Sequence, residues 1–204
     1  MRSHKTRGFT LIELIITISV LAILITILVI SINPAEHLAR ARDTRRTADL
    51  DSLGAALNLY MAQATTTPNL SGDATPNNRC VGGAGVDTFF VNTTGVVGTP
   101  PGFAGVSATT TQVVGATGWL PARIDQTPGG ASIAKLPLDP TNGIGNSATH
   151  YYGFACNTSQ QYELTARLES AYYRDDLDAD GTDGGNSSST YETGITLTLI
   201  PNAY

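Results

Sequence analysis

The stretch from Lys5 to Pro34, KTRGFTLIELIITISVLAILITILVISINP, decides how the first part of this chain folds. Its apolar run, Phe9 to Ile32, contains a single charged residue, Glu13. As a helix, a run of this length spans about 36 Å, against a membrane hydrocarbon core of about 30 Å. Because no polar stripe follows one side of the helix, the sequence predicts a transmembrane helix over residues 9–33.

Two other membrane-targeting roles fit a basic start followed by an apolar run. A cleaved secretory signal is one, but the run is too long for it, and the Ala-x-Ala candidate at Ala39–Ala41 lies beyond the run and contains an arginine. An uncleaved signal anchor is the other. Basic residues flank the run on both sides, so the positive-inside rule leaves the orientation of an anchor open.

The position of Glu13 within the apolar run requires an explanation, because a carboxylate is unfavourable in a membrane. A carboxylate near the bilayer centre costs on the order of 2.5 to 3.5 kcal/mol, and less near the interface. One interpretation is a side chain that reaches the lipid headgroups from the helix end. In the other, a cut between Gly8 and Phe9 creates an α-amino group four residues before Glu13. Pairing this ammonium with the carboxylate of a staggered neighbouring helix would favour association.

The segment Arg7–Leu14, RGFTLIEL, resembles the class III signal of bacterial type IV pilins and type II secretion pseudopilins. The resemblance implies that a membrane prepilin peptidase cleaves after Gly8 and N-methylates Phe9, and that Glu13 is the assembly residue. It further implies a leader, residues 1–8, that stays in the cytoplasm. The implied fate is a homo-oligomeric filament with minor pilins, assembled from the inner membrane by a platform and an assembly ATPase.

Residues 34–64 read as a second, amphipathic helix. Many pilins have a helix-softening proline where this chain has Ile30, and here Pro34 predicts a kink or short break. Apolar residues recur at spacings of three and four: Leu50, Leu53, Leu57, Tyr60 and Met61. Mixed charges from Glu36 to Asp51 fit either a solvated face with ion pairs or pairing between subunits.

Residues 65–204 are expected to form the globular head. A variable region over about 65–147, rich in Gly and Thr, shows short β-prone pieces: Val86–Thr94, Thr111–Gly115 and Gly118–Leu120, with Trp119 as a core residue. A C-terminal sheet over about 148–201 is predicted from three β-rich segments: Tyr151–Cys156, Gln161–Leu168 and Tyr191–Ile200. In the last of these, Ile195, Leu197 and Leu199 alternate with other residues, as in a half-buried strand.

The predicted fold is therefore α+β. A long N-terminal membrane-spanning helix continues into a half that packs on a small antiparallel sheet, and this is the pilin fold that the resemblance implies.

The two cysteines, Cys80 and Cys156, lie in the part of the chain that a membrane anchor would leave outside the cytosol. Disulfides persist there, so we expect a bridge, which would stabilise the fold by roughly 4 kcal/mol in the chain-entropy model. Two buried free thiols are the alternative. A zinc site is not expected, because two thiols without a nearby histidine pair do not make a ligand set.

An acidic loop, RDDLDADGTDGGN, spans Arg174 to Asn186. Its carboxylates match the first half of a calcium-loop pattern, but Ser187 stands where a bidentate glutamate is wanted. We predict a possible calcium ion bound by four aspartates: Asp176, Asp178, Asp180 and Asp183. The alternative is a solvated acidic turn. Together with KLPLDPTNG, Lys135–Gly143, this loop resembles the Leu-Pro-x-Asp-Pro segment and calcium loop of major pseudopilins, without the aromatic residue after Asp-Pro.

Catalysis is not expected. The histidines His4, His37 and His150 are scattered, and no nucleophile, zinc or phosphate-binding motif occurs. Glu163 and Glu169 are expected to face solvent. The formal net charge is −5 for the whole chain and −8 from Phe9 onward, so nucleic-acid binding is also not expected. No cofactor is required.

Taken together, these features predict a structural subunit of a type IV pilus-like filament. It would be a single-pass protein of the inner (cytoplasmic) membrane before it enters an extracellular or periplasmic filament. A major pseudopilin of a type II secretion system is the first alternative, and a membrane-anchored binding or adhesion module is the second.

Overall fold

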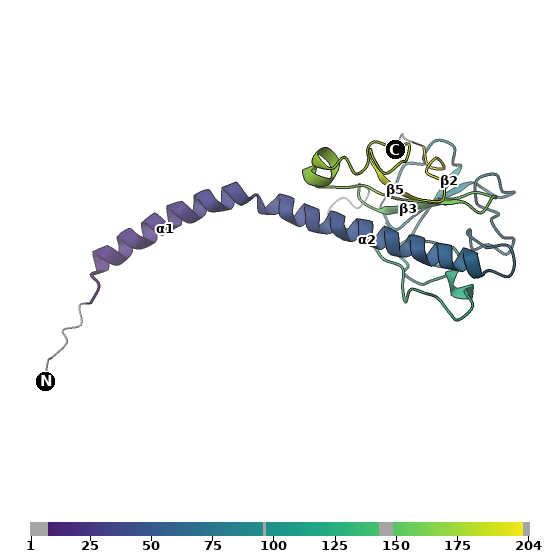
Figure 1. Cartoon of the computed structure of the whole chain (residues 1–204), viewed down its shortest axis with the longest axis horizontal. Helices are drawn as coiled ribbons and strands as arrows, with labels where there is room; N and C mark the ends of the chain where they lie inside the picture. Colours follow the sequence, from purple (N-terminus) through teal and green to yellow (C-terminus); the bar gives the residue numbers. More distant parts are fainter. Residues whose placement is uncertain (1–7, 96, 143–148, 202–204) are drawn as a thin grey trace. The chain divides into compact units, whose positions relative to one another are not determined.

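A computed structural model of the chain describes residues 8–95, 97–142 and 149–201. The leader before Gly8 and the last residue of the segment Lys135–Gly143 lie outside these ranges. The chain divides into two compact units, Met1–Leu38 and Ala39–Tyr204, each of which is described by itself. Figure 1 follows the elements from the N-terminal helix to the strands of the head.

The first helix, α1, runs from Leu11 to Ile32 and confirms the predicted apolar helix. It begins at Thr10, whose side chain accepts the amide hydrogen of Glu13, and it ends at Asn33 in the left-handed conformation. Three hydroxyls inside the helix donate to its own backbone carbonyls, at 2.7–2.8 Å: Thr17, Ser19 and Thr26. By length and composition this helix can cross a membrane.

The second helix, α2, runs from Pro34 to Gln63. The break predicted at Pro34 is confirmed, since Asn33 is the one non-helical residue between the helices. Proline suits the first helical position, where its missing N–H leaves no hydrogen bond unmade. The predicted apolar face is also confirmed: Leu50, Leu53, Leu57 and Tyr60 are buried, and Met61 packs beside them.

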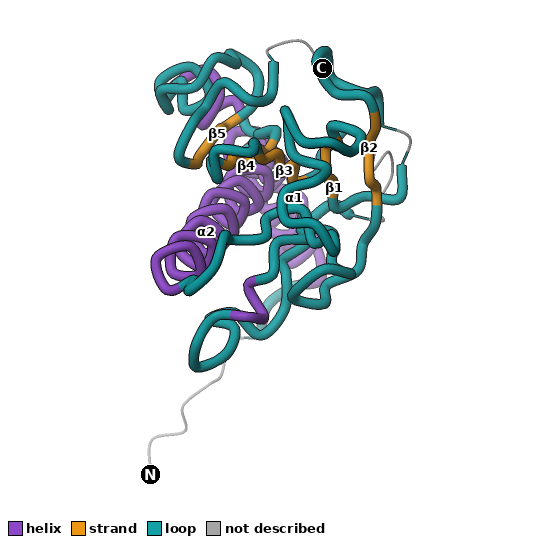
Figure 2. Tube along the Cα trace, turned by 90° about the vertical axis from the view of Figure 1, so that its right-hand side faces the viewer, coloured by secondary structure: helices purple, strands orange, loops and turns teal. Residues whose placement is uncertain are grey.

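Five strands form one sheet in the order β2-β1-β3-β4-β5. The strands are β1 (Thr88–Val91), β2 (Gly105–Ala108), β3 (Tyr152–Cys156), β4 (Tyr162–Ala166) and β5 (Tyr191–Gly194). The three predicted C-terminal strands, now β3, β4 and β5, pair antiparallel as expected. β1 also pairs antiparallel with β3, whereas β2 pairs parallel with β1, so the sheet as a whole is mixed. Figure 2 shows α2 running across one face of the sheet.

The variable region differs most from expectation. Strand β2 had no sequence signal, and the predicted strands at Thr111–Gly115 and Gly118–Leu120 are irregular segments. The two segments are joined by the bond from the Trp119 amide to the Thr111 carbonyl, but they form no strand ladder. Trp119 is nevertheless fully buried, as predicted, and its indole N–H donates to the Pro137 carbonyl at 2.9 Å.

The last predicted strand is also shorter than expected. β5 ends at Gly194, and residues 195–200 are not a strand, although Ile200 is buried. The amides of Leu199 and Ile200 donate to the Glu163 side chain and not to a neighbouring strand. A side chain therefore supplies the acceptor that a strand partner would have supplied.

The sheet has an apolar cluster on each face. On the α2 face, Tyr152, Phe154 and Leu164 pack with the buried residues of the helix and with Trp119. The opposite face, here called the far face, carries a smaller cluster of five buried residues: Phe89, Val91, Phe103, Ala155 and Ile200. A Cβ at position 153 would lie 2.5 Å from the Phe89 ring, so only glycine lets that ring cross the sheet there.

Candidate functional site

The predicted cleavage residues lie just before α1. Gly8 and Phe9 are exposed, and a side chain at Gly8 would meet no atom within 4 Å. Phe9 is 82% exposed. The peptide bond between these two residues is therefore accessible to an enzyme, and a side chain at position 8 would not disturb the fold.

Glu13 lies in the first turn of α1 and is exposed. Its amide donates to the Thr10 side chain at 3.3 Å, so its backbone is capped. A carboxylate there interacts favourably with the partial positive charge at a helix N-terminus. Cleavage before Phe9 would add a full positive charge close to this carboxylate along the chain.

The rest of α1 is a continuous apolar surface. None of its residues is buried, and its leucine, isoleucine and valine side chains are at least half exposed, from 50% at Ile15 to 77% at Leu11. Soluble proteins rarely expose an apolar surface of this extent, so such a surface marks contact with lipid or with other protein. The helix is built to be covered by something outside this chain.

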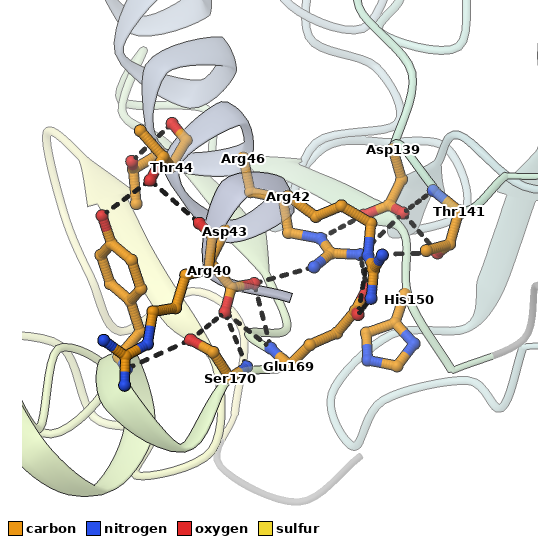
Figure 3. A network of polar contacts seen from close by, with 12 residues as sticks. Arg40, Arg42, Asp43, Thr44, Arg46, Asp139, Thr141, His150, Glu169 and Ser170 are labelled. Carbon is orange, nitrogen blue, oxygen red and sulfur yellow. Dashed lines mark hydrogen bonds and ion pairs between the residues drawn. The ribbon is translucent and has the colours of Figure 1, made fainter. Parts of the chain in front are cut away.

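Inside the head, a polar cluster ties α2 to two distant loops (Figure 3). Arg46 is fully buried and forms a bidentate pair with Asp139, at 2.7 and 3.0 Å, and a further ion pair with Asp43 at 2.8 Å. It also pairs with Glu169, which Arg42 reaches at 2.5 Å. A buried guanidinium is stable only when its donors are satisfied in this way.

Electrostatics within this cluster favour the ionised forms. Burial alone would raise the pKa of Asp139, but the hydrogen bonds and charge of Arg46 hold it below its ordinary value. The pKa of Glu169 is likewise lowered, since the hydrogen bonds from Arg42 and Arg46 outweigh the effect of burial. Asp43 is buried too, and it accepts the amides of Glu169 and Ser170 and the Ser170 hydroxyl.

Three expectations about charged side chains are therefore corrected. Asp43 and Arg46 belong neither to a solvated helix face nor to a subunit contact, because they are buried within the head. Glu169 does not face bulk solvent, since its side chain is only 13% exposed. Glu163 is fully buried. The solvated-face interpretation holds for Arg45, which is 62% exposed and lies 3.6 Å from Asp49.

The predicted disulfide between Cys80 and Cys156 is present, and both residues are buried. It joins the end of β3 to the start of the variable region across a sequence separation of 76. A backbone bridge between Val81 and Asn157 follows directly. The bond thus holds the long variable region to the sheet.

The four aspartates predicted to bind calcium lie on an irregular loop. Asp176 ends a short π-helix, Tyr172–Asp176, and Asp178 is exposed in the left-handed conformation. Asp180 is buried, and Asp183 accepts the amides of Gly185 and Glu192. Within the described ranges, no three carboxylate, histidine or cysteine side chains gather into a group that could hold a metal ion. Calcium binding stays a prediction.

Comparison with known families bears on the N-terminal segment. Residues 3–29 match the prokaryotic N-terminal methylation motif, the class III prepilin signal of type IV pilins and pseudopilins. No curated protein and no solved structure matches the chain significantly. The chain thus combines the N-terminal signal of type IV pilins and pseudopilins with a long apolar helix and an α+β head.

Proposed function

We propose that this chain is a structural subunit of a type IV pilus-like filament. A prepilin peptidase cleaves it after Gly8 and methylates the new N-terminus at Phe9. The subunit then polymerises from the inner membrane through packing of α1 and through Glu13. The observation that carries the proposal is the methylation motif lying in register with an apolar helix that has no buried residue.

The α1 helix has two requirements that no described residue of its own unit meets. Its apolar side chains need a surface that excludes water, and neighbouring α1 helices in a filament provide one as well as lipid does. The Glu13 carboxylate needs a cation, and the ammonium of a cleaved Phe9 on an adjacent subunit provides it. Helix packing and charge pairing then favour the same staggered assembly.

The head supports a structural role in a different way. The ionisable groups of the polar cluster bind one another. Arg46 forms ion pairs with three carboxylates, those of Asp43, Asp139 and Glu169. Asp43 also accepts a backbone amide. Such groups stabilise a fold, because their hydrogen bonds and charges are already satisfied by partners within it. We therefore propose that the head acts by shape and surface and not by catalysis.

A second candidate function is that of the major pseudopilin of a type II secretion system. The segment around Lys135–Gly143 favours it, because Leu136 and Asp139 of its Leu-Pro-x-Asp-Pro pattern are buried, and Asp139 binds Arg46. The two roles differ in the product. Surface fibres shed by shearing would support a pilus, whereas a filament confined to the periplasm that is needed for export of a secreted protein would support a pseudopilus.

The decisive experiment is mass spectrometry of the mature N-terminus, compared between the parent chain and Gly8→Val. The parent is expected to begin with N-methylphenylalanine at Phe9. Gly8→Val is expected to remain uncleaved, and because position 8 has open space around it, this loss would report on the peptidase and not on misfolding. A parent chain that keeps Met1, or that is cut near Ala41, would contradict the proposal.

A further inference from the structure

A small pocket, with a cavity volume of about 160 Å³, lies on the far face of the sheet. Its lining comes from four segments that are distant in the sequence, and its side chains include Val97, Thr149, Tyr151, Thr165, Arg167 and Thr190. A Cβ at Gly153 would meet both the Phe89 ring and the Thr165 hydroxyl, at 2.5 and 2.6 Å, so Thr165 points to the far face. Tyr151 packs against the apolar cluster of that face, with its ring centroid 6.5 Å from that of Phe89. The pocket therefore lies on the opposite side of the sheet from α2.

Two of the lining side chains present hydrogen-bond donors that the described part of the chain does not use. The guanidinium of Arg167 is exposed and has no ion pair or hydrogen bond to any described residue. Other arginines of the head that solvent reaches do pair with carboxylates: Arg45, Arg79 and Arg123. The Tyr151 hydroxyl, on a half-buried side chain, likewise has no described acceptor. Unused donors that line a pocket point to a ligand rich in acceptors.

The lining combines one cation with hydroxyl groups and apolar atoms. Arg167 is the one charged side chain among the described lining residues. A guanidinium binds a carboxylate through two parallel hydrogen bonds, which fix the orientation of the bound group. Each threonine hydroxyl both donates and accepts hydrogen bonds, and it therefore complements the hydroxyl groups of a ligand. Val97 adds apolar surface for ring carbons, which an inorganic anion would not use.

The size of the pocket limits the ligand to about one ring. A cavity of about 150 Å³ holds a molecule of benzene, so this pocket has room for one six-membered ring and not for a fused ring system. We propose that the pocket binds one carboxylate-bearing sugar ring, a uronic acid, with its carboxylate on Arg167 and its hydroxyls on the threonines and Tyr151. This binding role goes beyond the structural role proposed above and does not depend on it.

The local electrostatics keep both donors available. Burial raises the pKa of Tyr151 to about 12, although the charge of Arg167 acts in the opposite direction. The tyrosine therefore keeps its proton at physiological pH. Glu169 lines a neighbouring hollow together with Arg167, but its oxygens pair with Arg42 and Arg46. It therefore leaves Arg167 to the carboxylate of a ligand.

The neighbouring hollow has a volume of about 460 Å³ and shares Thr149 and Arg167 with the pocket. A sugar ring in the pocket is thus either a free molecule or the end of a longer chain that continues into the hollow. Both sources present the same carboxylate and hydroxyls to Arg167, so the experiment separates them by the length of the saccharide.

The test is ligand binding to the full mature chain in uncharged detergent micelles, followed by ligand-observed NMR. Galacturonate is expected to bind with a dissociation constant of about 1 mM, as is usual for a ligand of this size. Galactose has a hydroxymethyl group in place of the carboxylate, and acetate has the carboxylate without the ring. Each is expected to bind at least about tenfold more weakly. A chelator is present throughout, so that calcium cannot bridge the ligand to the acidic loop.

Trigalacturonate separates the two sources. If the trimer binds at least about tenfold more tightly than galacturonate, the ligand is the end of an acidic polysaccharide. A smaller gain, or a loss, supports a free sugar acid.

Variants locate the binding on the pocket. Arg167→Gln is expected to weaken galacturonate binding at least about tenfold and to leave galactose binding unchanged, because it removes only the charge-assisted hydrogen bonds. Arg167→Lys keeps the charge without the planar fork and should retain part of the affinity. Tyr151→Phe, which removes one hydroxyl, should weaken the binding of both sugars and carries the test if Arg167→Gln is unstable. Arg45→Gln makes the same change at an exposed arginine of α2 and should bind like the parent.

Several results would overturn the proposal. Equal binding of galactose and galacturonate would show that Arg167 takes no carboxylate, and equal binding by folded Arg167→Gln and the parent would place the site elsewhere. Tighter binding of inorganic phosphate than of galacturonate would make Arg167 a site for small anions and not for a sugar acid. An absence of galacturonate binding far above the expected dissociation constant would remove the site altogether.

Discussion

The two units of this protein treat charge in opposite ways. The α1 helix carries one carboxylate, Glu13, exposed on an apolar surface. Among its described residues the head buries six charged side chains, and three of these form one ion-paired group, Arg46 with Asp43 and Asp139. A charge that is removed from water needs a partner. For Arg46 the chain provides that partner, and for Glu13 the described residues do not.

This difference separates a self-sufficient part from one that depends on other molecules. The head pairs Arg46 with carboxylates of the same chain, closes its long loop with a disulfide and carries an apolar cluster on each face of its sheet. By contrast, the side-chain hydrogen bonds described for α1 are local: three hydroxyls donate to carbonyls of the same helix, and Thr10 accepts the Glu13 amide. The apolar side chains and the carboxylate of α1 are therefore the parts of the molecule that we expect to act in assembly.

The largest effect is expected from removing the unpartnered charge. Glu13→Gln should be cleaved and methylated normally but should assemble poorly, because the ammonium of each neighbouring Phe9 loses its counterion in an apolar medium. Each 1.4 kcal/mol lost per contact lowers an association constant about tenfold, so filament yield should fall at least about tenfold. Sheared or detergent-extracted filaments can be counted by electron microscopy, with N-terminal mass spectrometry to confirm processing.

Two further variants of α1 test whether assembly depends on the charge of Glu13 or on the size of the side chain. Glu13→Asp keeps the charge on a shorter side chain and should retain part of the assembly. Ser19→Ala removes a hydroxyl that donates to the Ile15 carbonyl of its own helix, so it should assemble like the parent. If correctly trimmed Glu13→Gln subunits polymerise as readily as the parent, α1 does not depend on a partner's charge and the contrast with the head fails.

In the head, the greatest loss of stability is expected from breaking the Arg46 cluster. Arg46→Leu leaves the carboxylates of Asp43 and Asp139 buried without their cation, which should cost about 3 to 5 kcal/mol in the free energy of unfolding. Arg45→Leu, one residue earlier and on the exposed face, should change it by less than about 0.5 kcal/mol. Urea unfolding of the full chain in micelles measures both. Equal losses would mean that burial of Arg46 contributes nothing beyond a surface pair.

The disulfide should contribute somewhat less than the Arg46 cluster. Reduction, or the paired change Cys80→Ala and Cys156→Ala, removes a cross-link over a sequence separation of 76 and should cost about 2 to 4 kcal/mol. The melting temperature of the head, followed by near-ultraviolet circular dichroism with and without a reductant, gives the answer. An unchanged melting temperature after verified reduction would show that the variable region is held to the sheet by packing alone.

The sequence predicted the elements whose signals are local. The apolar run gave α1, the spacing of Leu50, Leu53 and Leu57 gave the face of α2, and Pro34 gave the break. The match to the methylation motif covers residues 3–29, which include Gly8, Phe9 and Glu13, while the roles of these residues stay predictions. The residues that define each of these helical features lie within a few turns of one another, so the local sequence pattern is enough to predict the local structure.

What escaped prediction depends on partners that are far apart in the chain. Arg46 and Asp139 are separated by 93 residues, and Glu163 receives amides from 36 and 37 residues away, so neither burial could be read from neighbouring residues. β2 is short, lies beside glycine and proline, and gains its definition only by pairing parallel with β1. The alternation from Ile195 to Ile200 fits a strand, but the Glu163 side chain takes the place of a strand partner.

The smallest expected effect is a loss of folding stability at low pH, caused by protonation of the carboxylates that pair with Arg46 and Arg42. The pKa values of Asp139 and Glu169 are held below their ordinary values by Arg46 and Arg42, so the stability they add is present above pH 4 to 5 and is lost as the pH falls through the lowered values. The loss should be smaller than in Arg46→Leu, because a protonated carboxyl is neutral whereas removal of the arginine leaves buried negative charge. Urea unfolding from pH 6 down to 3 should show this decline in the parent. In Arg46→Leu the slope should reverse, since protonation would then relieve unpaired carboxylates; a decline of the same sign in both chains would mean that groups outside this cluster cause the loss.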